Sequence, residues 1–328
     1  MASGVTGPVA ESTKHTGLRN FFKRLVKEKP LGTVGAAIVL ILFFVAIFPG
    51  LIAPYGINED WAGEFLEPPS GNHWFGTDGL GRDIFSRVVY GARISVIVGL
   101  SASAIATVIS LIIGTISGYI GGKLDFVLQR FVDIGMTIPQ LVLMIVFISI
   151  IGTGMLQVIL VIGLLWGVVG SRIVRSAVIG IKENVYLDAA RATGCSTLKI
   201  LIRHVLPNIM APTIILFTTR VPNVILVESS LSFLGFGIPP PAPSWGGMIS
   251  GAGSAYMLRA PWMIVFPGLA LASVVYGVNI FGDAMRDLLD PRLVGGVGRY
   301  GLGEKGGEKE VTEKRNPGAG RLDRAAKQ

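Results

Sequence analysis

Charge and cysteine are both scarce in this sequence. Only 15% of its 328 residues are charged, and Cys195 is its single cysteine. One cysteine excludes an intramolecular disulfide, so the chain is not a small secreted domain held together by disulfides. So few charges do not fit the surface of an ordinary soluble domain. With 51% hydrophobic residues, the composition instead predicts a protein that lies in a lipid bilayer.

The chain also lacks the motifs of nucleotide binding and catalysis. No Gly-x-x-x-x-Gly-Lys-Ser/Thr sequence occurs, so we expect any ATP to be bound by another subunit. A Gly-x-Gly-x-x-Gly match at residues 296–301 has no strand before it and no helix after it, which favours chance. Three histidines, His15, His73 and His204, lie far apart in the sequence. We therefore predict no catalytic, cofactor-binding or metal site, and no enzyme activity of its own.

The net charge of +8 is distributed unevenly along the chain. Of the lysines and arginines, six precede residue 31, two lie at 121–131, six at 172–204 and ten follow residue 282. The segments between the other hydrophobic runs hold only Arg82, Arg87, Arg93 and Arg259. This is the positive-inside pattern of a membrane protein, not a basic surface for nucleic acid. It predicts that both termini lie in the cytoplasm.

Long uncharged runs predict an all-α membrane protein with six transmembrane helices, because about 20 apolar residues cross the hydrocarbon layer. The first follows six basic residues and is expected to be an uncleaved signal anchor. The 38 uncharged residues 134–171 are too long for one span and are expected to turn at 152–154. The expected spans are 31–49, 94–120, two within 134–171, 209–227 and 260–282.

The segments between and beyond the spans complete the expected layout. An interfacial helix is predicted at 83–93, where apolar residues alternate with charges at helical spacing. Four prolines at 239–243 forbid a regular helix in the uncharged stretch 229–258, so residues 229–259 are expected to be an external loop folded back on the membrane surface. The layout is a cytoplasmic segment 1–30, a first transmembrane helix 31–53, an extracytoplasmic segment 54–92, a core 93–293 that holds the other spans, and a disordered cytoplasmic tail 294–328.

A polar insert at residues 184–208, here called the docking segment, interrupts the hydrophobic runs. A short Ala-rich helix is predicted at 186–193, and Gly194 is expected to break it. A second helix is expected to pack through Leu198, Leu201, Ile202 and Val205, and Pro207 is expected to end or kink it. Small alanines with a charged rim favour docking of a partner protein over catalysis.

The docking segment resembles the EAA loop of ABC importer permeases. That motif reads Glu-Ala-Ala, three residues, Gly, nine residues, a variable position, one more residue and Leu-Pro. Asp188 replaces the usual Glu, and His204 stands where Ile is frequent. The resemblance implies that the following residues couple the chain to ATPase subunits: Tyr186, Asp188, Ala189, Ala190, Arg191, Gly194, Leu206 and Pro207.

Three further motifs lie around the docking segment in the expected order. HWFGTDGLGRDIFSRVVYGAR precedes the second span, LSFLGFGIPPPAPSWGGM follows the fifth, and GDAMRDLLDPRL follows the sixth. Over residues 20–293 the chain resembles the C-type subunit of the dipeptide/oligopeptide (Dpp/Opp) permease family. The resemblance implies a type I ABC importer permease in a prokaryotic cytoplasmic membrane. It also implies a heterodimer with a B-type permease subunit, two P-loop ATPases that hold ATP and Mg²⁺, and an extracytoplasmic substrate-binding protein.

Polar residues within the fifth span and its end are candidates for the translocation path or a gate. They are Arg220, Asn223 and Glu228, and structural contacts that fix helix register are the alternative. Arg220 and Glu228 are eight positions apart, too far to pair along one helix, so each is expected to meet another span or a partner subunit. Other substrates, namely nickel, glutathione or oligosaccharides, fit the same motifs. A secondary transporter and a non-transporting scaffold are the alternatives of another class.

Overall fold

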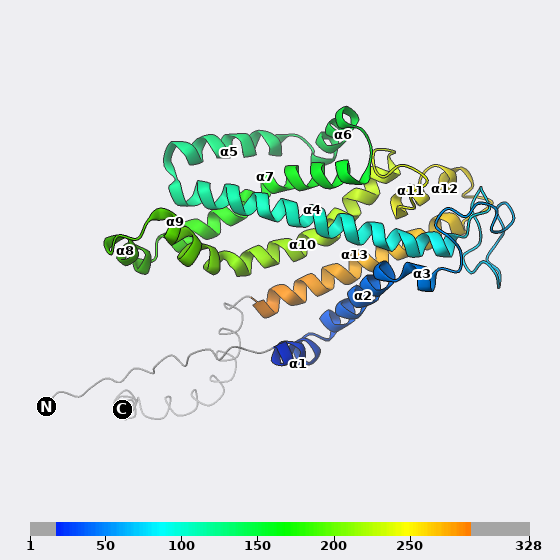
Figure 1. The fold of residues 1–328 in the computed structure, drawn as a ribbon, viewed down its shortest axis with the longest axis horizontal. Coiled ribbons are helices and arrows are strands. Elements are labelled where there is room, and N and C mark those ends of the chain that lie inside the picture. The colour runs from blue at the N-terminus through cyan, green and yellow to red at the C-terminus, as the bar shows by residue number, and fades with distance from the viewer. Residues whose placement is uncertain (1–17, 290–328) are drawn as a thin grey trace, which may run out of the picture.

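The computed structural model describes residues 18–289, and all the regular elements in that range are helices. The long helices pack side by side and extend from one end of the molecule toward the other (Figure 1). The bounds of the helices are α1 (Leu18–Glu28), α2 (Pro30–Ile47), α3 (Pro49–Ile52), α4 (Ile84–Ile120), α5 (Gly122–Thr137), α6 (Gln140–Ile151), α7 (Met155–Lys182), α8 (Val185–Ala192), α9 (Thr197–Ile200), the π-helical segment η1 (Leu201–Val205), α10 (Leu206–Phe233), α11 (Trp245–Ile249), α12 (Ala252–Ala255) and α13 (Trp262–Leu289).

Five helices in the described range are long and apolar enough to cross a membrane, and a sixth span results if α5 and α6 count as one. The all-α expectation is confirmed, but the third span differs from the expected straight helix. It is bent by 94° between α5 and α6. Ile138 is extended there because Pro139 follows it, and a residue before proline avoids the helical conformation. The break expected at 152–154 is present between α6 and α7.

The second span is one continuous helix of 37 residues, α4. The sequence led us to expect a separate interfacial helix at 83–93; residues 84–93 are helical, but they form the first turns of α4. Ile84 and Val88 are buried against Ala260, which precedes α13, and against Met263 in its first turn, so the apolar face meets protein rather than lipid headgroups. The helix consequently extends well beyond its uncharged stretch.

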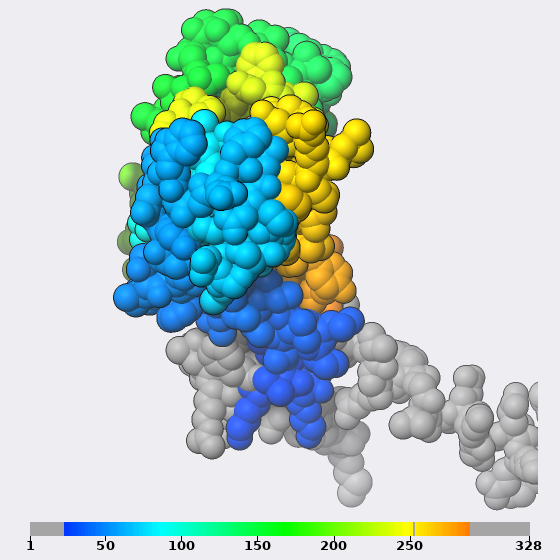
Figure 2. Space-filling model, turned by 90° about the vertical axis from the view of Figure 1, so that its right-hand side faces the viewer, coloured from blue at the N-terminus to red at the C-terminus, as the bar shows by residue number. Residues whose placement is uncertain are grey.

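The loop after the fifth span is also shorter and more embedded than expected. Helix α10 continues to Phe233, so the loop begins at Leu234 rather than at residue 229. Trp245 of α11 is buried, and its Nε1 donates to the Val88 carbonyl of α4 at 3.0 Å. The loop therefore packs into the helical body and is not merely laid on a membrane surface. Together with residues 53–83 it covers the end of the molecule opposite α8, and we call residues 53–83 and 234–261 the cap (Figure 2).

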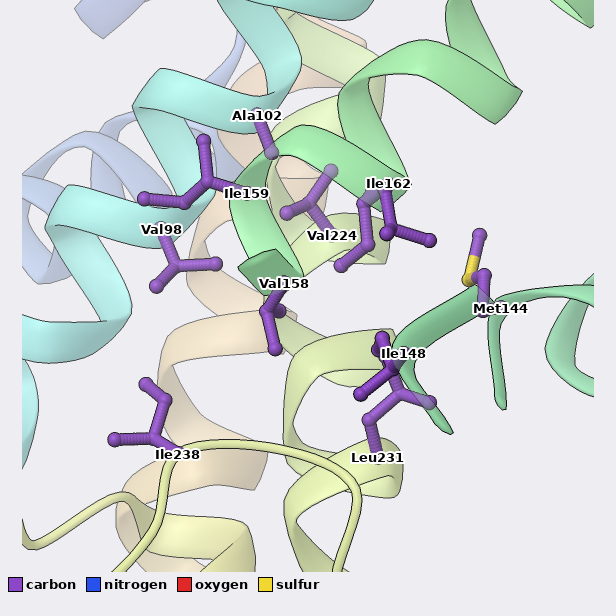
Figure 3. Packing of buried hydrophobic residues seen from close by; sticks show 11 residues of the cluster. Val98, Ala102, Met144, Ile148, Val158, Ile159, Ile162, Val224, Leu231 and Ile238 are labelled. Carbon is purple, nitrogen blue, oxygen red and sulfur yellow. The ribbon is translucent and has the colours of Figure 1, made fainter. Parts of the chain in front are cut away.

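The tightest helix pair is α4 with α7, where glycines allow close approach. A Cβ atom on Gly114 of α4 would lie 2.5 Å from the Ser171 carbonyl oxygen of α7, and one on Gly167 would lie 2.6 Å from the Ile109 Cβ atom. Side chains from α4, α6, α7 and α10 converge on the largest buried cluster, among them Val98, Met144, Ile162 and Leu231 (Figure 3). The pair α4–α7 thus forms the frame on which α6 and α10 pack.

Candidate functional site

The first helix of the docking segment, α8, ends in a glycine cap. Gly194 has a φ of +79°, and its N–H donates to the Arg191 carbonyl at 2.9 Å. The N–H of Cys195 donates to the Ala190 carbonyl at 3.1 Å, which completes a Schellman motif. The break predicted at Gly194 is therefore present. A side chain at this position would meet no neighbour, but it would have to adopt the left-handed backbone.

Three buried side chains fasten the docking segment to the helical body. Leu187 of α8, Ile200 of α9 and Val205 of η1 are buried in one cluster with Val174 and Val178 of α7. These contacts hold the segment at one end of the long helices (Figure 1). Packed apolar groups therefore join α8 directly to α7.

The predicted packing face of the second helix of the docking segment is only half correct, because Leu201 and Val205 pack in the buried cluster and Leu198 and Ile202 do not. Leu198 and Ile202 are 66% and 57% exposed, whereas Ile200 and Val205 are buried. The cause is the π-helical segment η1, in which the Leu206 N–H donates to the Leu201 carbonyl five residues back. The wider turn changes the register of the buried side, which a constant helical period does not anticipate.

The same π-helical turn explains the course of the chain at Pro207. Pro207 has no backbone N–H, and its ring crowds the preceding turn of the helix. The sequence therefore predicted that the helix ends or kinks at Pro207. The helix instead passes from η1 into α10 without interruption, with Leu206 half-buried and Pro207 exposed. Asn208 follows and donates from Nδ2 to the Tyr186 hydroxyl at 3.2 Å. Both ends of the docking segment are thereby joined to each other.

The outer surface of the docking segment carries apolar and small side chains among charged ones. Asp188 and Arg191 form an exposed ion pair at 2.9 Å, and Gly194 borders open space. Exposed ion pairs contribute little to stability. The exposed apolar and small side chains of the surface are Val185, Tyr186, Ala189, Ala192, Leu198 and Ile202.

A buried tyrosine connects α8 to the end of α4. The Tyr119 ring lies 5.6 Å from the Arg191 guanidinium of α8 and 5.8 Å from the Lys182 ammonium of α7. Both distances are within the range of cation–π attraction. Tyr119 is also part of the cluster that holds Leu187. Residues from three helices thus meet at this ring, a contact that the sequence did not reveal because they are separated by 63 and 72 positions.

Arg220, the first candidate for the translocation path, is buried inside the subunit. Its Nη2 donates to the Ser110 hydroxyl of α4 at 3.1 Å and to the Trp166 carbonyl of α7 at 3.0 Å. Gly170 provides the room, because a Cβ atom there would overlap the guanidinium. Arg220 therefore ties α10 to both α4 and α7, and the expectation that it meets another span is confirmed.

Glu228 and Asn223 differ from Arg220 in their surroundings. Glu228 is fully buried and accepts hydrogen bonds from Ser232 at 2.7 Å and Ser229 at 3.3 Å. Both partners belong to its own helix, and within residues 18–289 the carboxylate accepts no hydrogen bond from another span. Asn223 is exposed, and its Nδ2 donates to the Thr219 carbonyl at 2.8 Å. Only Asn223 of the three lies on the outer surface of the subunit.

The cap holds a buried polar network that the sequence did not indicate. His73 Nδ1 lies 3.0 Å from Asp83 Oδ1, and Asp83 Oδ2 accepts the Ser86 N–H at 2.7 Å. Asp83 thereby caps the first turn of α4. Arg87 donates to the Ile57 carbonyl at 3.2 Å. One part of this network had a signal in the sequence: Asp83 directly precedes an apolar helical pattern, as an N-cap residue does.

No group of three His, Cys, Asp or Glu side chains within residues 18–289 is placed to hold a metal ion. A cavity of about 310 Å³ in the cap is bordered by Asp78, Arg82 and Arg87, and it continues along the 235–242 loop. Arg82 is paired with Asp78 at 2.8 Å, so the charges beside this cavity largely compensate one another. We assign no ligand to this cavity.

The chain matches two family models. Residues 110–295 match the model of the binding-protein-dependent transport system inner membrane component, and residues 18–69 match the N-terminal TM domain of oligopeptide transport permease C. The first match covers more than half of the chain. The protein therefore belongs to the family of binding-protein-dependent transport system inner membrane components, the permease subunits of ABC importers.

Individual relatives extend over most of the chain. The dipeptide transport system permease protein DppC of Alkalihalophilus pseudofirmus is 37% identical over 286 residues, which is 87% of this chain and 93% of that protein. The oligopeptide permease OppC of Bacillus subtilis is 36% identical over 81% of this chain and 87% of its own length. The glutathione transport system permease GsiD of Escherichia coli is 38% identical, covering 84% of this chain and 90% of its own.

A solved structure shares the fold. It is an inward-facing form of the MetNI methionine ABC transporter, with a TM-score of 0.51 and 19% sequence identity. The likeness covers 62% of this chain and 96% of that chain. At this identity the comparison concerns the fold alone, which is that of an ABC transporter permease.

Proposed function

We propose that this permease subunit imports di- and oligopeptides. Support comes from relatives of two kinds, the dipeptide and the oligopeptide permeases, which align with 81–87% of the chain at similar identity. Glutathione is the second candidate, because the glutathione permease is as similar as the peptide permeases. Glutathione is itself a tripeptide, so both candidates require a path that accepts peptide bonds.

The assembly that we propose contains a B-type permease subunit, two P-loop ATPases that bind ATP and Mg²⁺, and an extracytoplasmic binding protein. The observation that supports an ATPase partner is the exposed apolar surface of the docking segment, including Leu198 and Ile202. Large apolar side chains at the end of a helical bundle favour contact with another protein. Nucleic acid is not among the proposed partners, because the basic residues follow the positive-inside pattern.

The orientation that we propose places both termini and the docking segment in the cytoplasm of a prokaryotic cell, with the protein in its cytoplasmic membrane. The cap then lies outside. Its segments carry few basic residues, whereas the docking segment and its flanks carry six between residues 172 and 204. An orientation of this kind puts the ATPases beneath α8 and the binding protein above the cap.

The mechanism that we propose is mechanical. ATP-driven closure of the ATPases moves α8 and α9, and hydrolysis reverses the movement. Leu187 transmits the displacement to α7, and Arg191 transmits it through Tyr119 to α4. ATP binding biases the helices only if the docking segment makes different contacts in the inward-facing and outward-facing states. The free surface of α8 allows such a change without loss of the buried anchors.

Uptake of labelled peptides tests the proposal. Cells with and without this gene receive labelled di- and tripeptides, glutathione, nickel and an oligosaccharide in parallel. We expect loss of peptide uptake alone, or of peptide and glutathione uptake together. Intact peptide uptake with loss of another ligand would replace the substrate and keep the permease. A protonophore added while ATP is maintained should leave uptake intact, which a secondary transporter would not; loss of no ligand would favour the scaffold alternative.

A further inference from the structure

The exposed faces of the membrane-spanning helices are not alike. Beyond Arg93, every fully exposed residue of α4 is apolar, and so is every one of α2. Hydrocarbon side chains of this kind are suited to lipid. Large members of these two faces are Ile41, Phe44 and Ile47 of α2, and Ile97, Val108, Ile112 and Ile116 of α4.

The neighbouring helices α10 and α13 expose polar side chains instead. Asn223 of α10 and Asn279 of α13 are exposed, and Tyr276 is 60% exposed. Ser273 adds a hydroxyl one turn from Tyr276. Four polar residues in the middle of two transmembrane helices therefore turn away from the subunit's own core.

These residues lie at similar depth. A Cβ atom on Gly282 of α13 would lie 3.5 Å from the Thr218 carbonyl of α10, so the two positions are level. The helices run in opposite directions, as their order in the chain and Figure 1 show. Asn223 lies five residues after Thr218, and residue 277 lies five residues before Gly282. Tyr276 and Asn279 are consequently within one turn of Asn223 in height.

Helical spacing also extends this face toward the cap. Asn223 and Ser230 are seven residues apart and share one side of α10. Ser230 borders a groove of about 300 Å³ together with Leu226, Phe233 and Leu271. The polar face thus continues into a hollow that opens near the cap. Arg220 and Glu228 are buried against the subunit core and do not belong to it.

Lipid is a poor neighbour for this face. The Nδ2 groups of Asn223 and Asn279 donate to carbonyls of their own helices at 2.8 and 2.9 Å. Among residues 18–289, the side-chain oxygens of these two asparagines accept no hydrogen bond. A polar group facing hydrocarbon without a partner is disfavoured by several kcal/mol, and in proteins such groups face protein or water.

We propose that Asn223, Tyr276 and Asn279 line the translocation path and contact the main chain of the transported peptide. This inference rests on the proposed function. Amide and phenol groups offer both donors and acceptors without charge, which matches the peptide group that every di- and oligopeptide shares. Contacts with the main chain do not depend on the sequence of the peptide. Side-chain selection is then left to other parts of the transporter.

Cysteine labelling tests this inference in the assembled transporter. Cys195 is replaced by alanine, and single cysteines are introduced by Asn223→Cys, Tyr276→Cys or Asn279→Cys. Val108→Cys and Ile112→Cys on α4 are matched controls that face away from the proposed path. Membranes from cells that express the full transporter are treated with a small hydrophilic thiol reagent. The reactive species is the thiolate, which forms where water has access, so we expect the path positions to react at least about tenfold faster than the controls.

The same variants separate a path from a subunit interface. Trialanine should slow the labelling of all three path positions and leave Val108→Cys unchanged. Equal labelling rates at path and control positions would overturn the inference. So would slow labelling combined with efficient crosslinking of Asn279→Cys to the partner permease.

Failure of the proposed function gives a different result. If cells lacking the gene lose no peptide uptake, the assignment of peptides as the substrate fails. Labelling then shows only whether water reaches positions 223, 276 and 279. If the unaltered transporter imports trialanine but trialanine does not slow fast labelling, the contact with the peptide main chain is overturned while the proposed function stands.

Discussion

The two ends of the molecule are held by different interactions. The cap is fixed by buried polar contacts between segments far apart in sequence, such as His73 with Asp83 and Trp245 with Val88. The docking segment is fixed by three apolar anchors and presents a free surface. Directional contacts define one geometry, whereas apolar packing at the edge of a bundle tolerates displacement. In the mechanism proposed above, the cap is the fixed end, and the docking segment is the end that moves relative to α7 and α4.

The largest effect on stability is expected from Asp83→Ala in the cap. The change removes the N-cap of α4 and leaves buried His73 without its partner, a loss of roughly 2 to 4 kcal/mol. Thermal unfolding of the detergent-solubilised complex measures it. Asp60→Ala is the control, because Asp60 is exposed and its carboxylate lies 3.9 Å from the Arg82 guanidinium, too far for a hydrogen bond. Equal melting temperatures of the two variants would contradict a cap fixed by buried polar contacts.

A smaller loss of stability is expected from Leu187→Ala in the docking segment. Truncation of buried leucine costs about 2 to 5 kcal/mol, and we expect the lower end because the exposed segment can relax into the space. Uptake should nevertheless fall strongly, since the anchor between α8 and α7 is lost. Val185→Ala on the exposed side of α8 provides the stability control. If Leu187→Ala melted at a lower temperature than Asp83→Ala, the docking segment and not the cap would be the more rigid end.

Gly194→Val is expected to separate transport from folding. A β-branched residue is disfavoured at a positive φ by on the order of 1 to 3 kcal/mol. We expect the backbone to relieve this strain by tilting α8 relative to α9. No core contact is touched, because a side chain at this position meets no neighbour. We expect a normal amount of protein in the membrane, continued ATP hydrolysis and uptake reduced at least about tenfold, the factor that ~1.4 kcal/mol represents.

Gly194→Ala provides the graded comparison for Gly194→Val. Alanine adopts the left-handed backbone at lower cost than valine, so its uptake should lie between those of the unaltered protein and the valine variant. Unchanged transport by Gly194→Val would remove the docking segment from the coupling mechanism.

The smallest effect is expected at Tyr119, where the docking segment meets α4. Tyr119→Phe keeps the ring above Arg191 and Lys182, whereas Tyr119→Leu removes the cation–π attraction of about 0.5 to 2 kcal/mol. We expect an unchanged ratio of peptide imported to ATP hydrolysed for the phenylalanine variant and a several-fold lower ratio for the leucine variant. Equal ratios would show that Tyr119 only fills space.

Features with a strong local signal were predictable from the sequence. The hydrophobic runs predicted the spans because crossing a membrane requires a minimum apolar length. The break at Gly194 was predictable because a glycine followed an Ala-rich helical pattern. The resemblance of the docking segment to the EAA loop depends on the spacing of Asp188, Gly194 and Pro207, and its coupling role stays a prediction.

Features that depend on packing were not predictable in this way. The π-helical turn before Pro207 moved Leu198 to the surface and Ile200 to the core, because it departs from the 3.6-residue period on which the prediction depends. Arg220 was recognised as costly, but its partners Ser110 and Trp166 belong to other helices. Long-range contacts of this kind leave no local pattern in one sequence.

Site-specific photocrosslinking tests the central claim most directly, namely that the docking segment contacts an ATPase and changes this contact with nucleotide. A photoreactive amino acid replaces exposed Leu198 in one variant and buried Ile200 in a matched control two residues away. The account predicts a crosslink from position 198 to a P-loop ATPase identified by mass spectrometry, with a yield that changes when ATP is added, and none from position 200. Absence of the ATPase crosslink from position 198 in a transporter that hydrolyses ATP, or a yield that ATP does not alter, would contradict it.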